Sequence, residues 1–451
     1  MTPSLLMRIS RKRITQRQAL VFFAAAGLIW RLALALPIYE AHRPGTPAAG
    51  DADLYLALAE NLLAGRGYTI DPDPPHEPFV FRTPTYALFL AGVLGLSGGS
   101  HAVAVAVQVL LDLTTGLWLF LLARRLWPSR PRLPLLVFGL WATFPGVGSL
   151  AGRLIAEVLA TFLVTSGILL LACAAAARGA RGAGLAAAAG ATLLLAVFAR
   201  PQLVAVVILL PLLAAAFHVP GRQSRSARRL LVLAMVGVLL VEGSWVIRNL
   251  RAVGEPVLFS GGLGELVLAM GAAGEARWET MKHAEETLAA EGLVVSRNPA
   301  ERYHDRGRYL RFALEHIRQH PLHYVSLSLR RAVLLWATPR TAIYGVKPAA
   351  LRGALRHPLA PQSRSTLLVV GFFGLYYAVL LALAALAAVR HRHDRALWAI
   401  LIALPIAVTA VNMWLYLEAR YALPTFPAVV LAAAIGLDDR MAKDVQPAAV
   451  A

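Results

Sequence analysis

Hydrophobic runs of membrane-spanning length recur along the whole chain, separated by short connections that often carry arginine. A helix needs about 20 mostly apolar residues to cross the hydrocarbon core of a bilayer. Ten runs are predicted to do so, at 18–37, 102–123, 133–149, 155–176, 183–199, 201–218, 230–247, 366–389, 396–414 and 422–437. The pattern predicts an all-α integral membrane protein with about 10 (10–12) transmembrane helices.

Two long segments, 38–101 and 248–365, interrupt the series of apolar runs. Both contain shorter amphipathic or apolar stretches that suit helices lying at a membrane surface. Such interfacial or surface helices are predicted at 84–98, 276–292, 299–320 and 322–344. The last of these is assigned to the surface because it contains the adjacent cations Arg330 and Arg331.

Positive charge falls in every second connection between the apolar runs. The basic segments are 1–17, 124–132, 177–182, 219–229, 390–395 and the C-terminal tail. Because basic loops stay on the cytoplasmic side, we expect a multi-pass protein of the inner (plasma) membrane with both termini in the cytoplasm. The first apolar run is long enough to span the membrane, so we expect an uncleaved helix and not a secretory signal.

This topology divides the chain into three parts. Residues 1–247 form an N-terminal transmembrane module that includes the first periplasmic loop, 38–101. Residues 248–365 form a long periplasmic loop with amphipathic helices, and 366–451 form the C-terminal transmembrane helices and a short cytoplasmic tail.

The amino-acid composition is that of a membrane protein, and this affects how the positive net charge is interpreted. The 451 residues are 58% hydrophobic and only 15% charged. A net charge of +19 would suggest nucleic acid in a soluble chain, but here arginines flank apolar runs, so lipid headgroups explain them and no nucleic-acid partner is expected. The one cysteine, Cys173, excludes an internal disulfide.

Asp51 is the first candidate for chemistry. It follows Gly50 and precedes a helical pattern in the first long loop, with Asp53 close behind. One interpretation is a helix N-cap, a common role of aspartate. The other is a general base kept ionised at the positive end of a helix.

Arg82 lies at the far end of the same loop, before Thr83-Pro84. An arginine there can simply extend toward lipid headgroups. Proline at the start of the next helix fixes the chain direction, however, and a guanidinium held in this way suits a phosphate.

Glu157 begins an otherwise apolar run, where an ionisable group is costly. Its carboxylate is a candidate metal ligand or acceptor-orienting group. The alternative is an ion pair with Arg153, one helical turn earlier.

Three further arginines, Arg200, Arg248 and Arg420, lie at predicted extracytoplasmic ends of spans. Their charge opposes the positive-inside bias, so each requires a reason. A shared anionic ligand, such as a lipid phosphate, is one reason, and headgroup anchoring is the other.

Two weaker patterns are set aside. His316, His320 and His323 have helical metal-ligand spacing, but Pro321 interrupts the helix and no carboxylate completes a zinc motif. The glycines at 261–264 lack the strand and helix of a nucleotide loop.

The ordered set of these residues resembles the GT-C membrane glycosyltransferases. It is similar to the bacterial family related to the protein O-mannosyltransferases (glycosyltransferase family 39) and to the aminoarabinose transferases that modify lipid A. The similarity covers nearly the whole chain, and its motifs are Asp51…Tyr55, Arg82-Thr83-Pro84, Ala156-Glu157, Arg200-Pro201, Trp245…Arg248-Asn249 and Arg420-Tyr421. Thr83 replaces the first proline of the family's usual Pro-Pro pair.

The resemblance implies a GT-C bundle that uses a polyprenyl-phosphate-linked sugar on the extracytoplasmic face. It implies that Asp51 is the catalytic base and that arginines contact the donor phosphate. Arg82, Arg200, Arg248 and Arg420, with Tyr55 and Tyr421, are the expected substrate- and phosphate-binding residues. Glu157 and Asp53 mark a second acidic site, with a divalent metal ion left open as a cofactor and none otherwise required.

The function predicted on this basis is an inverting, mannosyltransferase-like glycosyltransferase of the cell envelope. It would transfer a hexose or pentose from a polyprenyl-phosphate donor to a protein, lipid or glycan acceptor in the envelope, with membrane lipids as its surroundings. The main alternative is a transporter or flippase of lipid-linked sugars. Transporters place polar groups near the membrane midplane and often contain repeats, whereas the ionisable residues here gather at the ends of spans.

Overall fold

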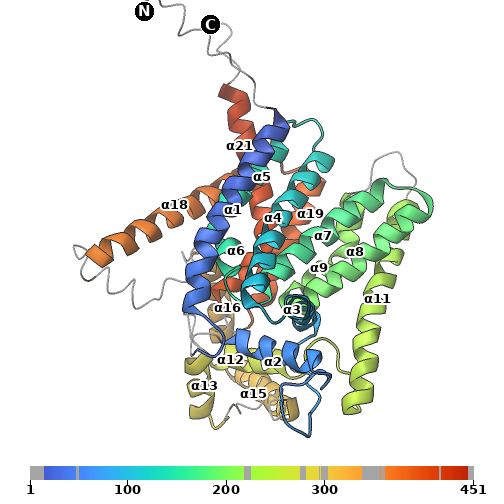
Figure 1. The fold of residues 1–451 in the computed structure, drawn as a ribbon, viewed down its shortest axis with the longest axis vertical. Helices are drawn as coiled ribbons and strands as arrows, with labels where there is room; N and C mark the ends of the chain where they lie inside the picture. The colour runs from blue at the N-terminus through green and yellow to red at the C-terminus, as the bar shows by residue number, and fades with distance from the viewer. Residues whose placement is uncertain are drawn as a thin grey trace, which may run out of the picture.

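The computed structural model describes residues 15–46, 50–217, 225–274, 281–293, 295, 303–337, 356, 361–415 and 418–444. Within these residues all regular secondary structure is helical, which confirms the predicted all-α class. The helices form a bundle with a layer of shorter helices across one end (Figure 1).

Eight helical stretches in the described part of the chain are long and apolar enough to cross a membrane. Six are the continuous helices α1 (Gln16–Ala41), α4 (His101–Leu126), α7 (Glu157–Ala176), α8 (Gly179–Ala199), α11 (Arg225–Val253) and α18 (Pro361–Arg390). The other two are Arg395–Asn412 and Arg420–Ala442, each built from consecutive helical elements. The chain is thus an integral membrane protein.

Two of the ten predicted spans, 133–149 and 201–218, are not among these eight stretches, because each is divided into short helices. The run 133–149 becomes α5 (Leu133–Thr143) and α6 (Pro145–Leu150). The run 201–218 becomes η2 (Pro201–Leu203), α9 (Val204–Ile208) and α10 (Leu210–Ala216), with residue 218 outside the described part. Pro145, Pro201 and Pro211 stand at these breaks, since proline lacks the N–H that would continue a helix.

The predicted span 396–414 is also irregular. It comprises α19 (Arg395–Leu401), the π-helical turn η4 (Ile402–Ile406) and α20 (Ala407–Asn412). Pro405 lies inside the π-helical turn, which accounts for the change in helical geometry. The last span, predicted at 422–437, consists of η5 (Ala419–Thr425) and α21 (Phe426–Asp444).

The surface helices predicted in the two long segments form the layer at one end of the bundle (Figure 1). The first segment contributes α2 (Asp51–Leu63) and α3 (Thr85–Leu96), and α3 has the short, apolar character predicted for 84–98. The second contributes the predicted helices α13 (Met281–Ala290), α15 (Arg306–Gln319) and α16 (Pro321–Ala337), together with α12 (Leu263–Ala273), which was not predicted. Helix α1 begins, and α21 ends, at the opposite end of the bundle.

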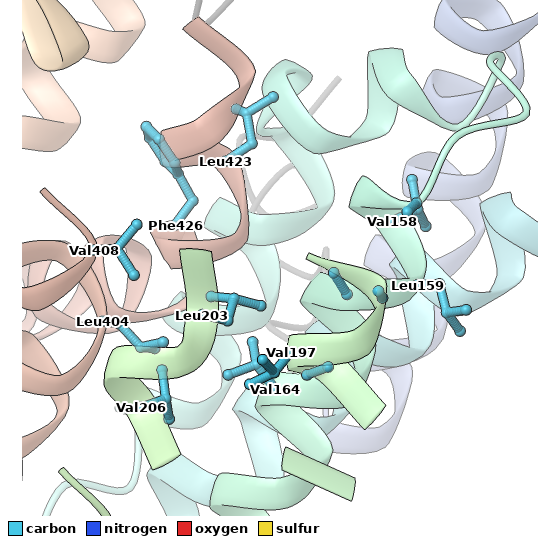
Figure 2. Close-up of a cluster of buried hydrophobic side chains, with 14 of the residues drawn as sticks. Val158, Leu159, Val164, Val197, Leu203, Val206, Leu404, Val408, Leu423 and Phe426 are labelled. Atoms are coloured by element: carbon cyan, nitrogen blue, oxygen red, sulfur yellow. The ribbon is translucent and has the colours of Figure 1, made fainter. Parts of the chain in front are cut away.

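The core of the bundle is packed by aliphatic side chains from α7, α8, α9, α20 and α21. Figure 2 shows Val164 of α7 beside Val197 of α8, with Leu203, Leu404 and Phe426 nearby. Helices α8 and α11 approach through Gly190 and Gly237, whose absent side chains leave room for the facing backbone. Such contacts between small residues are how membrane helices pack closely.

A buried ion pair holds the break between α5 and α6. Arg31 of α1 and Asp112 of α4 are both fully buried and paired with each other. Arg31 also donates to the carbonyl oxygens of Ala142 at 2.6 Å and Trp141 at 2.5 Å. These carbonyls lie at the end of α5, so the guanidinium satisfies acceptors that a broken helix leaves open.

Candidate functional site

A group of ionised side chains gathers where the surface layer meets the bundle. Asp51 is the first residue of α2, and Glu157 is the first residue of α7. Arg200 caps the end of α8, Arg420 lies in η5, and Arg82 precedes α3. Five segments that are far apart in the sequence therefore meet at the ends of helices.

Asp51 is clamped between two arginines. Its Oδ1 accepts from Arg82 Nη2 at 3.0 Å, and its Oδ2 accepts from Arg420 Nη2 at 2.8 Å. Gly50 precedes it with φ 56°, a conformation that favours glycine, and this turn directs the carboxylate toward the cluster.

The arginines determine the charge state of Asp51. Burial raises the pKa of its carboxyl, but the positive charges of Arg82, Arg420 and Arg200 outweigh that effect and hold the pKa well below its usual range. Asp51 is therefore ionised at every physiological pH.

Glu157 forms the second carboxylate of the cluster. Its side chain is fully buried and pairs with Arg200, and its Oε1 lies 3.3 Å from Arg420 Nε. Arg420 thus bridges Asp51 and Glu157, and it also pairs with Glu418. Glu418 was not among the site residues predicted from the sequence.

Two of the arginines retain unused hydrogen-bonding capacity. Among the described residues, neither Arg82 Nε nor Arg200 Nε has a hydrogen-bond partner, although both atoms are buried. A guanidinium carries five N–H donors, and a buried donor without a partner is costly. Unsatisfied donors in a site built from arginines are consistent with an anionic ligand that completes them.

Arg82 is held in place through its own backbone. The Tyr68 hydroxyl donates to the carbonyl oxygens of Arg82 and Thr83, each at 3.1 Å. Thr83 donates its hydroxyl to the carbonyl of Phe198 near the end of α8. This bond ties the Arg82 segment to the helix that ends at Arg200.

Tyr55 and Tyr421 border the cluster. Burial lowers the pKa of Arg82, but the facing Asp51, Tyr55 and Tyr421 raise it above its usual value. The Tyr55 ring also packs edge-on against Tyr86, with ring centroids 4.7 Å apart. Both tyrosines therefore lie near the arginine, as the sequence analysis expected of substrate-binding residues.

Two predicted site residues lie elsewhere. Asp53 is exposed and accepts from the Gly45 backbone N–H at 2.8 Å, within the loop that precedes α2. Arg248 donates to the carbonyl oxygens of Phe79 at 3.0 Å and Tyr68 at 3.1 Å. Its guanidinium braces the loop that leads to Arg82 and makes none of the ion pairs of the Asp51 cluster.

The cluster offers a poor set of metal ligands. No group of three His, Cys, Asp or Glu side chains suited to a metal occurs within the described residues. Asp51 and Glu157 are both paired with guanidinium groups, which compete with a cation for the same oxygens. The two carboxylates of the cluster are therefore better placed to bind arginine than a metal ion.

Comparisons with known proteins identify the fold. No family model and no curated protein matches the sequence. The crystal structure of the apo oligosaccharyltransferase of Archaeoglobus fulgidus matches 96% of this chain and 51% of its own, with a TM-score of 0.53 and 16% identity. The oligosaccharyltransferase AglB of the same organism, in complex with an inhibitory peptide and a dolichol-phosphate, matches 97% of this chain and 53% of its own (TM-score 0.53, 15% identity).

The present chain thus spans about half the length of these archaeal proteins. At this identity the likeness establishes the arrangement of helices. The comparison confirms the predicted fold, and the protein is an all-α integral membrane protein with the GT-C fold of the oligosaccharyltransferases.

Proposed function

We propose that this protein is an inverting glycosyltransferase that uses a polyprenyl-phosphate-linked sugar. The observation that carries the proposal is the Asp51 carboxylate bound on both oxygens by Arg82 and Arg420, with Arg200 and Glu157 behind them. A base and a set of phosphate-binding cations are thereby combined at the junction of bundle and surface layer. An archaeal protein with this fold has been solved in complex with a dolichol-phosphate, which supports a lipid-linked phosphate as the ligand proposed here.

The arginines would bind the phosphate and stabilise its departure. As the glycosidic bond breaks, negative charge grows on the leaving phosphate, and preformed cations lower the barrier most when they face that charge. The unused Nε–H groups of Arg82 and Arg200 are donors available for this contact. Arg420 is bonded to both carboxylates and would keep Asp51 at a fixed distance from the phosphate-binding arginines.

Asp51 would take the proton of the acceptor hydroxyl. With two arginines on its oxygens its pKa is too low for efficient proton transfer, because a general base works best near the operating pH. Donor phosphate would draw Arg82 toward itself while Arg420 stays bonded to both carboxylates, and Asp51 would become more basic. Base activation would then depend on the presence of donor.

The reaction forms a bond between the acceptor oxygen and the anomeric carbon while the bond from that carbon to the phosphate oxygen breaks. Attack from the face opposite the phosphate inverts the configuration. The acceptor proton passes to Asp51, and polyprenyl phosphate leaves as the anion. We place this site on the extracytoplasmic face of the inner membrane, with both termini in the cytoplasm, on the charge pattern of the connections.

The test is Asp51→Asn in full-length protein reconstituted in lipid nanodiscs. With radiolabelled polyprenyl-phosphate sugars and envelope fractions, wild type should transfer sugar and Asp51→Asn should not, although it still binds the donor lipid. Asp53→Asn is the matched control, because Asp53 lies two residues away on the same helix and outside the cluster. Normal transfer by Asp51→Asn would refute the base assignment.

The same preparation separates the enzyme from a flippase. A flippase would move lipid-linked sugar across proteoliposome membranes without forming a new glycosidic bond. Translocation without transfer would assign the protein to that class.

A further inference from the structure

A hollow lies beside the Asp51 cluster. Its volume is about 350 Å³, within the range of small-ligand sites. It is lined by the connection between α2 and α3, by the segment after α11 and by the residues just before α15. Its lining includes Asp71, Glu77, Phe81, Glu255, Tyr303 and His304.

The wall between this hollow and Arg82 is well supported. The Phe79 N–H donates to the Tyr68 carbonyl at 2.8 Å, and the Gly261 N–H donates to the Val80 carbonyl at 2.8 Å. Arg248 adds its bond to the Phe79 carbonyl. Anchored on both edges, this extended segment cannot shift without breaking several hydrogen bonds.

The hollow and the Asp51 cluster share one side chain. Phe81 lines the hollow, and the Arg82 guanidinium carbon lies 5.9 Å from the centre of its ring. A molecule seated in the hollow is thus one side chain away from the arginine that binds Asp51. That placement suits the molecule that receives the sugar.

The polar lining offers both donors and acceptors. Tyr303 donates its hydroxyl to Glu255 Oε2 at 2.7 Å, and Arg306 Nη2 binds the same oxygen at 2.5 Å. Burial and the bond to Glu255 raise the pKa of Tyr303 to about 12, so the phenol stays protonated. The carboxylates of Asp71 and Glu77 and the imidazole of His304 complete the rim.

This chemistry distinguishes between ligand classes. Within the part of the chain that the structure describes, no cation pairs with the carboxylates of Asp71 and Glu77, so these groups repel an anion and separate the hollow from the cationic phosphate site. A cation would meet Arg306 and Tyr303 already occupying Glu255. Sugar hydroxyls both donate and accept, so they match a lining in which carboxylates, phenol and imidazole alternate.

We propose that this hollow binds an uncharged, hydroxyl-rich saccharide, which is the acceptor of the transfer reaction. The proposal rests on the glycosyltransferase function proposed above. It narrows the acceptor from protein, lipid or glycan to a glycan with a neutral sugar at the site of attachment.

The experiment measures saccharide binding without donor. Full-length protein in nanodiscs is titrated with neutral trisaccharides of glucose, mannose and galactose, with trigalacturonic acid and with trilysine, by ligand-observed NMR. At least one neutral trisaccharide should bind and trigalacturonic acid should not. Tyr303→Phe should weaken that binding about tenfold, the effect of losing one hydrogen bond to a charged lining.

Glu77→Gln provides a second variant that does not disturb folding, because Glu77 is exposed. It should also weaken saccharide binding. Glu315→Gln is the matched control on an exposed face of α15 and should leave binding unchanged. The proposal would be overturned if none of the neutral trisaccharides bound. It would also be overturned if binding were unchanged in Tyr303→Phe and Glu77→Gln. Trilysine binding that depends on Glu77 would overturn it in favour of a basic peptide.

The two proposals fail separately. If Asp51→Asn binds the saccharide like wild type but transfers nothing, both proposals are supported. If wild type shows binding that depends on Tyr303 but transfers no sugar from any donor, the glycosyltransferase function fails alone. If sugar is transferred to acceptors whose binding ignores Tyr303 and Glu77, the hollow is not the acceptor site.

Discussion

At the scale of single residues, the central feature of the site is that the Asp51 carboxylate forms ion pairs with more than one arginine. Asp51 binds two, and the second of them, Arg420, comes from the other end of the chain. The sequence analysis associated Asp51 with Arg82 because both belong to one loop. It could not predict that Arg420 would bridge Asp51 and Glu157, since that geometry depends on the packing of α21 against the bundle.

The helix N-cap and the general base were competing interpretations of Asp51. Asp51 begins α2, but Gly50 occupies the cap position and no side-chain cap bond is present there. The carboxylate instead faces the arginines. The structure therefore favours the electrostatic interpretation, while the role of Asp51 as base stays a prediction.

Arg82→Gln provides the pH test. In wild type the pKa of Asp51 is depressed, so the carboxylate stays ionised well below pH 4, and acidic pH should not titrate it in kcat/KM. Removing Arg82 removes the positive charge that lowers the pKa of Asp51 most, so that pKa should rise and the acidic limb of kcat/KM should move to higher pH. The rate should also fall about 100-fold, the usual cost of losing one donor to a developing charge.

The measurement is transfer rate against pH at low donor concentration. Arg66→Gln serves as the control, because Arg66 is exposed and bonds only to nearby Asn61 in the described contacts. An acidic limb that does not move in Arg82→Gln would show that Arg82 does not control the ionisation of Asp51.

At the scale of elements, long apolar runs were predicted well and interrupted runs were not. Periodicity and length identify α4, α7 and α8 because no proline interrupts them, and α1 stays continuous although Pro37 lies in its last turns. The runs at 133–149 and 201–218 are apolar throughout, yet prolines divide them. Hydropathy predicts which segments lie in a bilayer, but it does not predict where the backbone hydrogen bonds of a helix are interrupted.

Arg248 shows a related limit. Its place at the end of an apolar run suggested a shared phosphate ligand, as for Arg200 and Arg420. Helix α11, however, lies at the edge of the bundle (Figure 1). Arg248 therefore reaches the loop at 68–79 and not Asp51. The sequence shows that a charged residue lies at the end of a helix. It does not predict how that helix packs in the bundle, and so it does not predict which residues the charged side chain contacts.

The contact between α8 and α11 gives a prediction about stability. A Cβ at Gly190 would collide with the backbone carbonyl of Ala234, so Gly190→Ala should push the two helices apart. We expect a loss of about 1–3 kcal/mol in the free energy of unfolding, as for other overpacked sites. Transfer should also fall, because α8 ends at Arg200.

Gly184→Ala is the matched control, since it lies on the same helix and a Cβ there meets nothing within 4 Å. Thermal unfolding of both variants in nanodiscs measures the difference. Equal melting temperatures for Gly190→Ala and Gly184→Ala would contradict the close approach of α8 and α11.

At the scale of the whole molecule, the fold places the charged cluster where the helical bundle meets the layer of shorter helices. The bundle supplies Glu157, Arg200 and Arg420, and the surface layer and its loops supply Asp51 and Arg82. The lipid-linked donor that we propose, with its tail in the bilayer, would present its phosphate to residues from both parts. The archaeal oligosaccharyltransferases share this arrangement of helices but are about twice as long.

The orientation of the molecule is open to direct measurement. In a Cys173→Ala background, Asp73→Cys reports on the first long loop and His393→Cys on the basic connection before α19; both positions are exposed. A membrane-impermeant maleimide added to intact spheroplasts should label Asp73→Cys and leave His393→Cys unlabelled until the membrane is opened. The reverse pattern would invert the topology and move the proposed site to the cytoplasm.

The pair formed by Arg31 and Asp112 also bears on biogenesis. An arginine inside α1 is costly in lipid until it is paired, and its partner lies in a helix that is synthesised later. Helix α1 should therefore remain at the insertion machinery until α4 emerges, so that the two helices enter the bilayer together. Charge neutralisation between nascent segments would then set the order of assembly.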